Sequence, residues 1–278
     1  MNNKELQTLI KSQKANHTLD QKFYIDDDIF ELDLKNIFSK QWVFVGHTSR
    51  IPNVGDYFLF EIGKESIIII KDKDLNIHAH YNVCRHRGSR VCLEQQGNAK
   101  LLVCPYHAWS YNLDGSIKSA RLMNDDFNSE EWRLNSCNVK IFEGLIYINL
   151  SDNPVRFEDF IFPTRKFIEL HGLGDAKIAH RAIYPTDGNW KLTLDNFHEC
   201  YHCGPAHPEY CSVHDKEYII AYGAGGETGP ESDKFNKILN DWNDKAKKLG
   251  HFVGEYIETE FNDFSRSAER TPLKEGKF

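Results

Sequence analysis

The chain has 278 residues, of which 40% are hydrophobic and 13% aromatic, and its formal net charge is −7. This composition is typical of a globular protein, and the negative charge argues against a nucleic-acid-binding protein, which needs a basic face. The most apolar run, Ile67 to Ile70, is too short to cross a bilayer. Met1 to Asp20 has no apolar signal-peptide core, so we expect a cytoplasmic protein.

The first predicted element is a helix that starts at Asp28. Its apolar residues follow helical spacing: Phe30, Leu34, Ile37, Phe38 and Trp42. From Val43 to Leu150 the pattern changes to short β runs separated by turn signals such as Asp114-Gly115 and Glu143-Gly144. The predicted strands are Tyr57–Ile62, Ser66–Ile70, Asn76–Tyr81, Leu101–Val103, Val139–Phe142 and Leu145–Leu150. This part of the chain predicts a small antiparallel β domain.

Pro154 and Pro163 predict a boundary after the β domain. The predicted fold class is therefore α+β, with an N-terminal helical segment at 1–42, a β domain at 43–157 and a mixed region at 158–278. Within the mixed region, Asn189 to Cys203 predicts a helix, and Ser232 caps another that ends at Gly250. The glycine cluster 223–226 lacks a strand-to-helix context, which favours a flexible loop over a phosphate site.

Seven cysteines are present, and an odd number in such a chain argues against a disulfide framework. Three of them stand apart from histidines and are predicted to be small core residues: Cys92, Cys137 and Cys211. The other four lie beside histidines, which favours metal ligation.

The first histidine-rich group lies in the predicted β domain. It consists of Cys84-Arg85-His86 and, farther on, Cys104-Pro105-Tyr106-His107. Two thiolates and two imidazoles could hold a tetrahedral zinc ion, or a 2Fe–2S cluster with both thiolates on one iron and both imidazoles on the other. Unligated buried side chains are the third interpretation. The short spacings suit two opposed loops around a flat inorganic core, which favours the cluster.

The second group runs from Asp195 to Pro208 and allows three interpretations. His198-Glu199-Cys200-Tyr201-His202 satisfies the zinc-protease pattern, although His207 does not fit its extended form. Cys200 and Cys203 have the spacing of a redox or zinc motif. Alternatively, His202 and His207 supply two imidazoles of a mononuclear iron site that leaves open positions for dioxygen and substrate.

Both groups resemble one family. The segments Cys84–Gly88 and Cys104–Trp109 resemble the paired motif of Rieske domains in non-heme iron oxygenases, and Asn189–His207 resembles the iron-binding segment of their α subunits. The resemblance implies cluster ligation by Cys84, His86, Cys104 and His107, in a Rieske domain followed by an incomplete, helix-grip-like catalytic domain. It also implies mononuclear iron on His202 and His207, and Asn196 becomes a candidate residue beside these ligands.

The resemblance implies further that Glu199 bridges His202 and the His107 of a neighbouring subunit, which requires a homotrimer. The family's third ligand, a downstream aspartate, has no match here, so the chain is expected to be a C-terminally truncated α subunit. The implied partner is an NAD(P)H-dependent flavin and iron–sulfur reductase. The Glu199–Cys203 run followed by His207-Pro208 is similar to the branch that acts on glycine betaine, choline, carnitine and stachydrine, which are cations suited to an aromatic cage. An aromatic-ring dioxygenase and a truncated, non-catalytic electron-transfer protein remain the alternatives.

Overall fold

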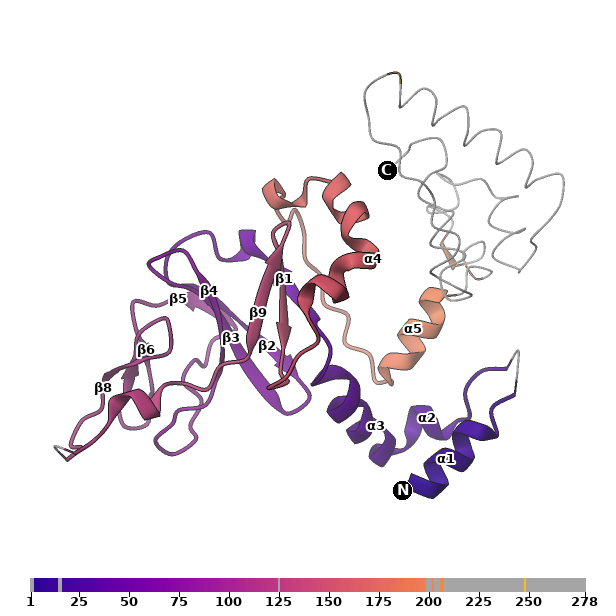
Figure 1. The fold of residues 1–278 in the computed structure, drawn as a ribbon, viewed down its shortest axis with the longest axis horizontal. Helices are drawn as coiled ribbons and strands as arrows, with labels where there is room; N and C mark the ends of the chain where they lie inside the picture. The colour runs from indigo at the N-terminus through magenta and orange to yellow at the C-terminus, as the bar shows by residue number, and fades with distance from the viewer. Residues whose placement is uncertain are drawn as a thin grey trace. The chain divides into compact units, whose positions relative to one another are not determined.

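The computed structural model describes residues 3–14, 17–124, 126–198, 202, 206, 207 and 248. The chain forms two compact units, one of Asp27–Tyr184 and the other of Asn2–Asp26 with Pro185–Phe278 (Figure 1). Several predicted features lie outside the described residues: Glu199, Cys200, Cys203, Cys211, the glycine cluster 223–226 and the helix capped by Ser232. Among the described residues, no helix combines the length and apolarity needed to cross a bilayer.

The first unit carries all the described strands. They are β1 (Val43–His47), β2 (Asp56–Ile62), β3 (Glu65–Lys71), β4 (Ile77–Tyr81), β5 (Gln96–Asn98), β6 (Leu102–Val103), β7 (Ser110–Tyr111), β8 (Ile117–Ser119), β9 (Asn138–Phe142) and β10 (Leu145–Asn149). The helices of this unit are α3 (Asp27–Asp33), a π-helical turn (Leu34–Phe38), α4 (Phe157–Leu170) and short 3₁₀ turns at Thr48–Arg50, Ser129–Trp132 and Leu173–Asp175. The second unit has α1 (Asn3–Lys11), α2 (Lys22–Ile25) and α5 (Trp190–His198).

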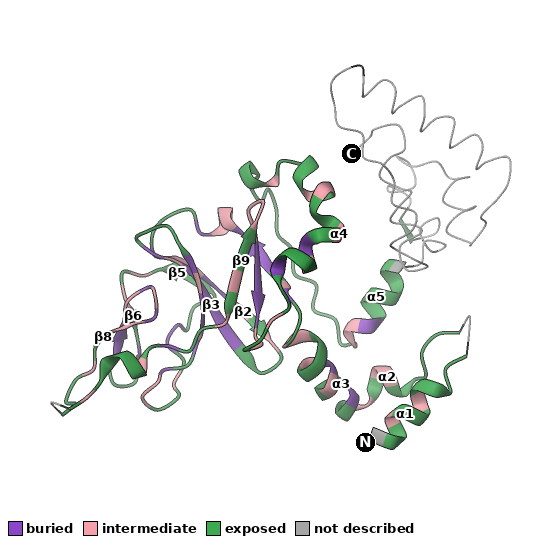
Figure 2. Ribbon diagram, viewed as in Figure 1, coloured by how far each residue is buried: buried purple, intermediate pink, exposed green. Residues whose placement is uncertain are grey.

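Three antiparallel sheets make up the first unit, with strand orders β4-β3-β2-β5, β1-β10-β9 and β6-β7-β8. The central strand β3 contains the apolar run Ile67 to Ile70, whose four side chains are all fully buried (Figure 2). Alternate side chains of a strand point to opposite faces. Ile68 and Ile70 accordingly enter one core, whereas Ile67 and Ile69 enter a second core shared with β1 and β10. The first core also contains Cys84 and Cys104, so β3 supports the predicted cluster site directly.

A third core joins α4 to the β1-β10-β9 sheet. Phe157 and Ile161 of α4 pack there with Trp42 and Tyr147. The prediction that Pro163 marks a boundary was wrong, because this residue lies inside α4. A proline within a helix costs about 3 kcal/mol, and burial of Phe157 and Ile161 offsets that cost at about 1.5–3 kcal/mol per side chain.

The predicted helix from Asp28 is present but ends earlier than its apolar spacing indicated. It passes into the π-helical turn and stops at Phe38, while Trp42 lies beyond it and donates from Nε1 to the Val155 carbonyl at 2.9 Å. The buried residues on α3 are Ile29 and Asp33, whereas Phe30 is exposed. The face of the helix that is buried is therefore displaced by one residue from the predicted apolar face.

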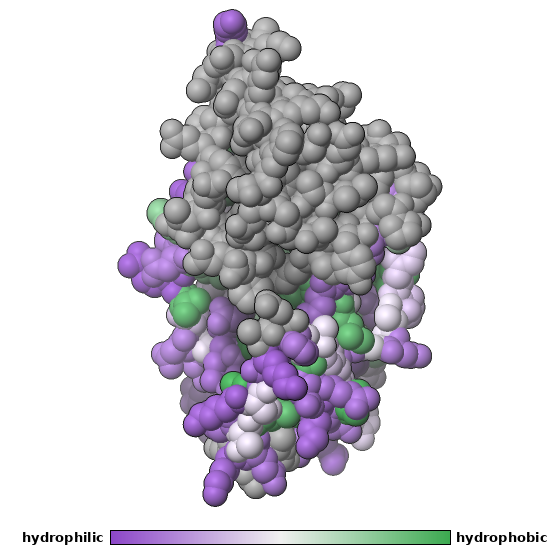
Figure 3. Space-filling view, turned by 90° about the vertical axis from the view of Figure 1, so that its right-hand side faces the viewer, coloured by the Kyte–Doolittle hydropathy of each residue, from purple (hydrophilic) through white to green (hydrophobic). Residues whose placement is uncertain are grey.

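The six predicted strands are confirmed to within one residue at each end. The Glu143-Gly144 hairpin turn is also confirmed, with positive φ angles of 48° and 75°. Strand β1 was missed because a bulge between Phe44 and Gly46 breaks its alternation. The fold class, α+β with antiparallel sheets, is confirmed. Where the face in Figure 3 is coloured, it is largely hydrophilic with separate hydrophobic residues among the charged ones.

Candidate metal centres

Two loops with the same backbone hydrogen bonds carry the four predicted cluster ligands. In the first loop, the Cys84 N–H donates to the Ser89 carbonyl at 2.8 Å and the Gly88 N–H donates to the Cys84 carbonyl at 3.0 Å. The second loop repeats both bonds between Cys104 and Trp109 and between Ala108 and Cys104. Gly88 and Ala108 have φ angles of 75° and 59°. This conformation costs a non-glycine residue about 1–2 kcal/mol, so the fold tolerates strain at Ala108 to keep the loops alike.

The cysteine sulfurs lie on the buried side of this pair of loops. Cys84 and Cys104 are each 2% exposed, and their thiols are hydrogen-bonding neighbours. Burial is the main cause that raises the pKa of Cys84 in the metal-free protein. A bound metal overrides that effect, since coordination removes the thiol proton outright.

The two imidazoles lie on the outer side. The His86 and His107 rings are 4.6 Å apart between centroids and nearly perpendicular, at 74°. His86 also stacks on the buried Trp109 at 4.9 Å, which fixes the plane of its ring. His107 is exposed. The outer end of this site therefore faces the surroundings through a histidine that can pass on electrons or protons.

These residues fit a Rieske cluster. In the part of the chain described, no three His, Cys, Asp or Glu side chains are grouped to hold a single metal ion; the four side chains instead form a sulfur pair and an imidazole pair. Arg85, between Cys84 and His86, has a buried Nε without a hydrogen-bond partner among the described residues. A cationic side chain with an unused donor suits a group that gains negative charge on reduction.

Asn82 closes the base of the first loop. It is fully buried, and its Oδ1 accepts from the N–H groups of Val91 at 2.9 Å and Cys92 at 2.8 Å. Its Nδ2 donates to the Cys92 carbonyl at 2.8 Å and to Ser66 Oγ at 3.3 Å. One carboxamide thus ties both ends of the loop to β3. Sequence reasoning missed Asn82 because its role depends on these pairings and not on a motif.

Tyr111 provides a second contact that the sequence did not reveal. Its fully buried side chain brings Oη to 3.2 Å from Cys84 Sγ, and the same oxygen accepts from the Arg85 N–H at 3.0 Å. Burial raises the pKa of Tyr111. The hydroxyl therefore keeps its proton and is able to donate a hydrogen bond to the Cys84 sulfur, a predicted cluster ligand.

We predict that Tyr111→Phe lowers the reduction potential of the cluster. A hydrogen bond to sulfur stabilises the more negative, reduced form. A differential effect of about 1 kcal/mol corresponds to about 40 mV for one electron. The matched control is Tyr57→Phe, because Tyr57 packs against the core that contains Cys92, which is not a candidate ligand. Redox titration of both variants checks the prediction, which fails if their potentials shift equally.

The other described cysteines are not placed as ligands. Cys92 is buried and Cys137 is partly buried. Burial raises the pKa of Cys92 to about 11 and that of Cys137 to about 12, so both thiols stay protonated. The prediction that these two are small core residues is confirmed.

The described part of the second group contains two close imidazoles. The rings of His202 and His207 are 5.3 Å apart between centroids and inclined at 77°. The Ala206 N–H donates to the His202 carbonyl at 3.0 Å. Two neighbouring imidazoles fit part of a two-histidine, one-carboxylate iron site. Asn196 lies exposed on α5, and the side chain of His198 lies outside the described residues.

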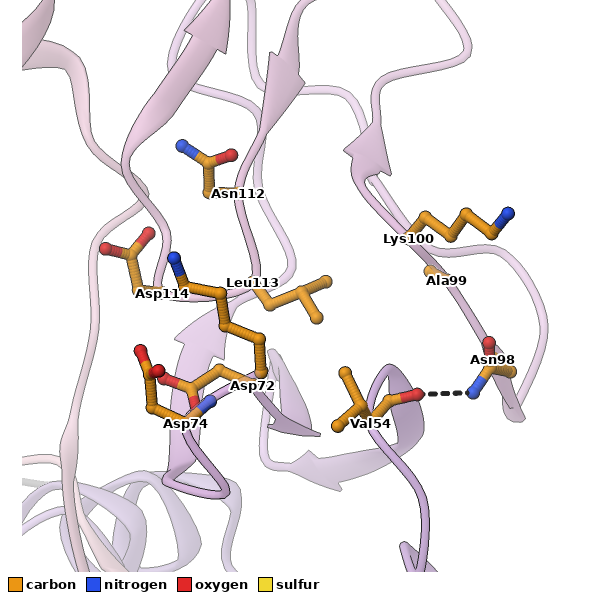
Figure 4. Close-up of a pocket in the computed structure, with 10 residues that line it drawn as sticks. Val54, Asp72, Asp74, Asn98, Ala99, Lys100, Asn112, Leu113 and Asp114 are labelled. Atoms are coloured by element: carbon orange, nitrogen blue, oxygen red, sulfur yellow. Dashed lines mark hydrogen bonds between the residues drawn. The ribbon is translucent and has the colours of Figure 1, made fainter.

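A hollow of about 530 Å³ also lies on the first unit (Figure 4). Its lining includes Asp72, Asp74, Asp114 and Asn98, and no predicted cluster ligand. The buried carboxylate there is already bonded: Asp72 accepts from His78 at 2.7 Å and from the Asn76 N–H at 2.8 Å. The metal-binding chemistry is thus concentrated in the two groups described above.

In a comparison with known proteins, the two histidine-rich groups fall within matches to two different families. Residues 41–141 match the family described as the Rieske [2Fe-2S] domain. Residues 173–262 match the catalytic domain of the ring-hydroxylating alpha subunit. The chain therefore contains, in this order, segments that match an iron–sulfur domain and the catalytic domain of a ring-hydroxylating alpha subunit. The chain belongs to the Rieske non-heme iron oxygenase alpha subunit family, whose cofactors are a Rieske cluster and a mononuclear iron.

Several similar relatives are named for quaternary ammonium compounds, and another, 29% identical over 96% of this chain, is the benzene 1,2-dioxygenase subunit alpha of Pseudomonas putida. The chain is 39% identical over 202 residues to the glycine betaine monooxygenase oxygenase subunit of Pseudomonas aeruginosa, covering 72% of this chain and 47% of the relative. It is 38% identical over 207 residues to the carnitine monooxygenase oxygenase subunit of Escherichia coli, covering 69% and 53%. The crystal structure of the quaternary ammonium Rieske monooxygenase CntA with L-carnitine matches with a TM-score of 0.64 and 36% identity, covering 70% and 57%. The chain thus spans about half the length of the curated relatives it matches.

Proposed function

We propose that this chain forms part of a terminal oxygenase that hydroxylates or demethylates a small quaternary ammonium compound. The observation that carries the proposal is the presence, in one chain and in the family's order, of the two matched loops and the His202–His207 pair. The identities of 38–39% to glycine betaine and carnitine monooxygenase subunits support the substrate class.

When bound, the Rieske cluster supplies single electrons and the mononuclear iron supplies the oxidative chemistry with dioxygen. Cys84 and Cys104 would hold one end of the cluster away from water, because both are buried. His86 and His107 would hold the other end, with His107 presenting its ring to a neighbouring subunit. His202 and His207 would hold the mononuclear iron, and Asn196 would lie beside them. A third, carboxylate ligand is not assigned.

Glu199 is proposed as the bridge between subunits. Its carboxylate would accept hydrogen bonds from His202 of its own chain and from the exposed His107 of a neighbour. This arrangement requires a homotrimer arranged head to tail. The proposed division is a helical segment at 1–42, the Rieske domain at 43–157 and the first part of the catalytic domain at 158–278.

The proposed electron donor is an NAD(P)H-dependent reductase with flavin and its own iron–sulfur centre. The proposed location is the cytoplasm. The four described cysteines are all free thiols, which suits a reducing compartment.

Oxygen uptake with a suitable reductase tests the function. We expect uptake and NAD(P)H consumption with glycine betaine, carnitine or a related cation, and not with aromatic acids. The control ligand is 3,3-dimethylbutanoate, in which carbon replaces the cationic nitrogen of glycine betaine. If cation–π contacts contribute about 2 kcal/mol, kcat/KM should fall about 30-fold with this analogue, which keeps the carboxylate but lacks the cationic nitrogen. Turnover of aromatic acids alone would instead establish a ring dioxygenase. Reversible cluster reduction without any substrate oxidation would establish an electron-transfer protein.

A further inference from the structure

A hydrogen bond connects the N-terminal segment to the helix that precedes the iron-site histidines. Tyr24 on α2 donates its hydroxyl to Oδ2 of Asp195 on α5 at 2.6 Å, across 171 positions of sequence. Both helices belong to the second compact unit, where Figure 1 shows α2 and α5. This length is typical of a strong hydrogen bond from a hydroxyl to a carboxylate.

The protonated state of Tyr24 maintains its hydrogen bond to Asp195. Burial, followed by the hydrogen bond and the charge of Asp195, raises the pKa of Tyr24. The Tyr24 phenol therefore remains a donor throughout the physiological range of pH.

Helix α5 is short, and much of its apolar surface is exposed. It has only nine residues, and isolated helices of that length are marginal in water. Its start is capped by Asn189, whose Oδ1 accepts from the Lys191 N–H at 3.1 Å. Its large apolar side chains are mostly exposed, at 51% for Leu192, 41% for Leu194 and 67% for Phe197. A bond that ties its middle to a distant segment therefore has a large effect on its direction.

The direction of α5 bears on the iron site through the sequence that follows. Asp195 precedes His202 by seven positions of sequence. The Ala206 N–H donates to the His202 carbonyl at 3.0 Å, and the His202 and His207 rings are 5.3 Å apart between centroids. A shift at Asp195 would thus reach the histidine pair along a short run of chain.

We propose that Tyr24 is a positioning residue for the mononuclear iron site, acting through Asp195 to set the direction of α5. The proposal rests on the proposed function, because it takes His202 and His207 as iron ligands. It assigns the N-terminal segment a specific part in building a site that lies far away in sequence.

The test compares Tyr24→Phe with the wild-type protein, both loaded with iron and cluster. The readout is the rate at which a chromogenic chelator removes Fe(II) under anaerobic conditions, with cluster absorbance followed in the same sample. Loss of partners that orient metal ligands costs 10–100-fold in metal affinity. The Tyr24–Asp195 bond does not include a predicted iron ligand, so its loss should have a smaller effect and speed iron release about threefold to tenfold. Co(II) substituted at the same site should also show an altered absorption spectrum.

Two further variants make the result specific. Asp195→Asn keeps an oxygen acceptor for the Tyr24 hydroxyl and should give a smaller change than Tyr24→Phe. Thr8→Val removes a hydroxyl that donates within α1, to the Lys4 carbonyl, and should release iron like the wild type.

Iron release and a Co(II) spectrum unchanged in Tyr24→Phe would overturn the inference and leave the proposed function standing. Equal losses of iron, cluster and thermal stability would also overturn it, because they indicate a general structural defect. A wild-type protein that binds cluster iron but no mononuclear iron would overturn both proposals together.

Discussion

Replacing Glu199 by glutamine is expected to reduce substrate oxidation about 100-fold while the cluster spectrum and its reduction by the reductase stay unchanged. Glutamine keeps the size of the side chain, but it removes the charge that would hold His107 of one subunit against His202 of the next. Stopped-flow measurement of cluster reoxidation, with dioxygen and substrate present, gives the rate. Glu158→Gln, a change on the first turn of α4, is the control and should turn over normally.

Mixed trimers test whether the electrons cross between subunits. Cys104→Ser should lose the cluster but keep Glu199 and the iron site, whereas Glu199→Gln keeps the cluster. If transfer runs between subunits, unfolding and reassembling the two inactive variants together should restore activity, because some neighbouring pairs then combine one intact cluster with one intact bridge. Mixtures as inactive as their components, with assembled trimers present, would contradict the intersubunit bridge.

The second large effect is expected at Asn82. Asn82→Ala leaves the buried N–H groups of Val91 and Cys92 without an acceptor. Each such group costs about 1–3 kcal/mol, or about 2–6 kcal/mol together. That is a large part of the 5–15 kcal/mol that stabilises a typical domain. We expect a lower urea midpoint and faster loss of cluster absorbance, since the first ligand loop is no longer closed.

A matched asparagine separates this effect from a general one. Asn98 also uses its carboxamide to donate two hydrogen bonds, each at 2.8 Å, to the Val54 carbonyl and to Asp56. It is exposed, so water replaces both bonds in Asn98→Ala and the cost should stay below about 1 kcal/mol. Equal destabilisation by the two substitutions would show that the burial of Asn82 does not matter.

The fold could be predicted where local pattern and tertiary structure agree. The β3 run and the Glu143-Gly144 turn are examples, because β-branched residues and a turn that needs positive φ each allow few alternatives. Strands β5, β7 and β8 have two or three residues each, and they exist only through pairing with neighbours. Pro163 misled the prediction, since its helix is stabilised by packing against Trp42 and Tyr147, which are distant in sequence.

The candidate site likewise has some residues that the sequence predicts and others that only the fold reveals. The four cluster residues could be proposed from spacing, because each pair lies within one short loop. Tyr111, Asn82 and Tyr24 could not, since no motif marks them and their partners are defined only by folding. Tyr111 meets Cys84 across 27 positions and Tyr24 meets Asp195 across 171. Sequence reasoning therefore finds the predicted metal ligands more easily than it finds the residues that position or hydrogen-bond those ligands.

The Tyr111 hydroxyl has two partners, the Cys84 sulfur and the Arg85 N–H. With Cys84 as a cluster ligand, one oxygen on β7 would affect both the electron affinity of the centre and the shape of the first ligand loop. A displacement of the β6-β7-β8 sheet would change the distance from Tyr111 Oη to Cys84 Sγ, and with it the reduction potential of the centre. In this chain the mechanical and electrical properties of the centre cannot be altered separately at that position.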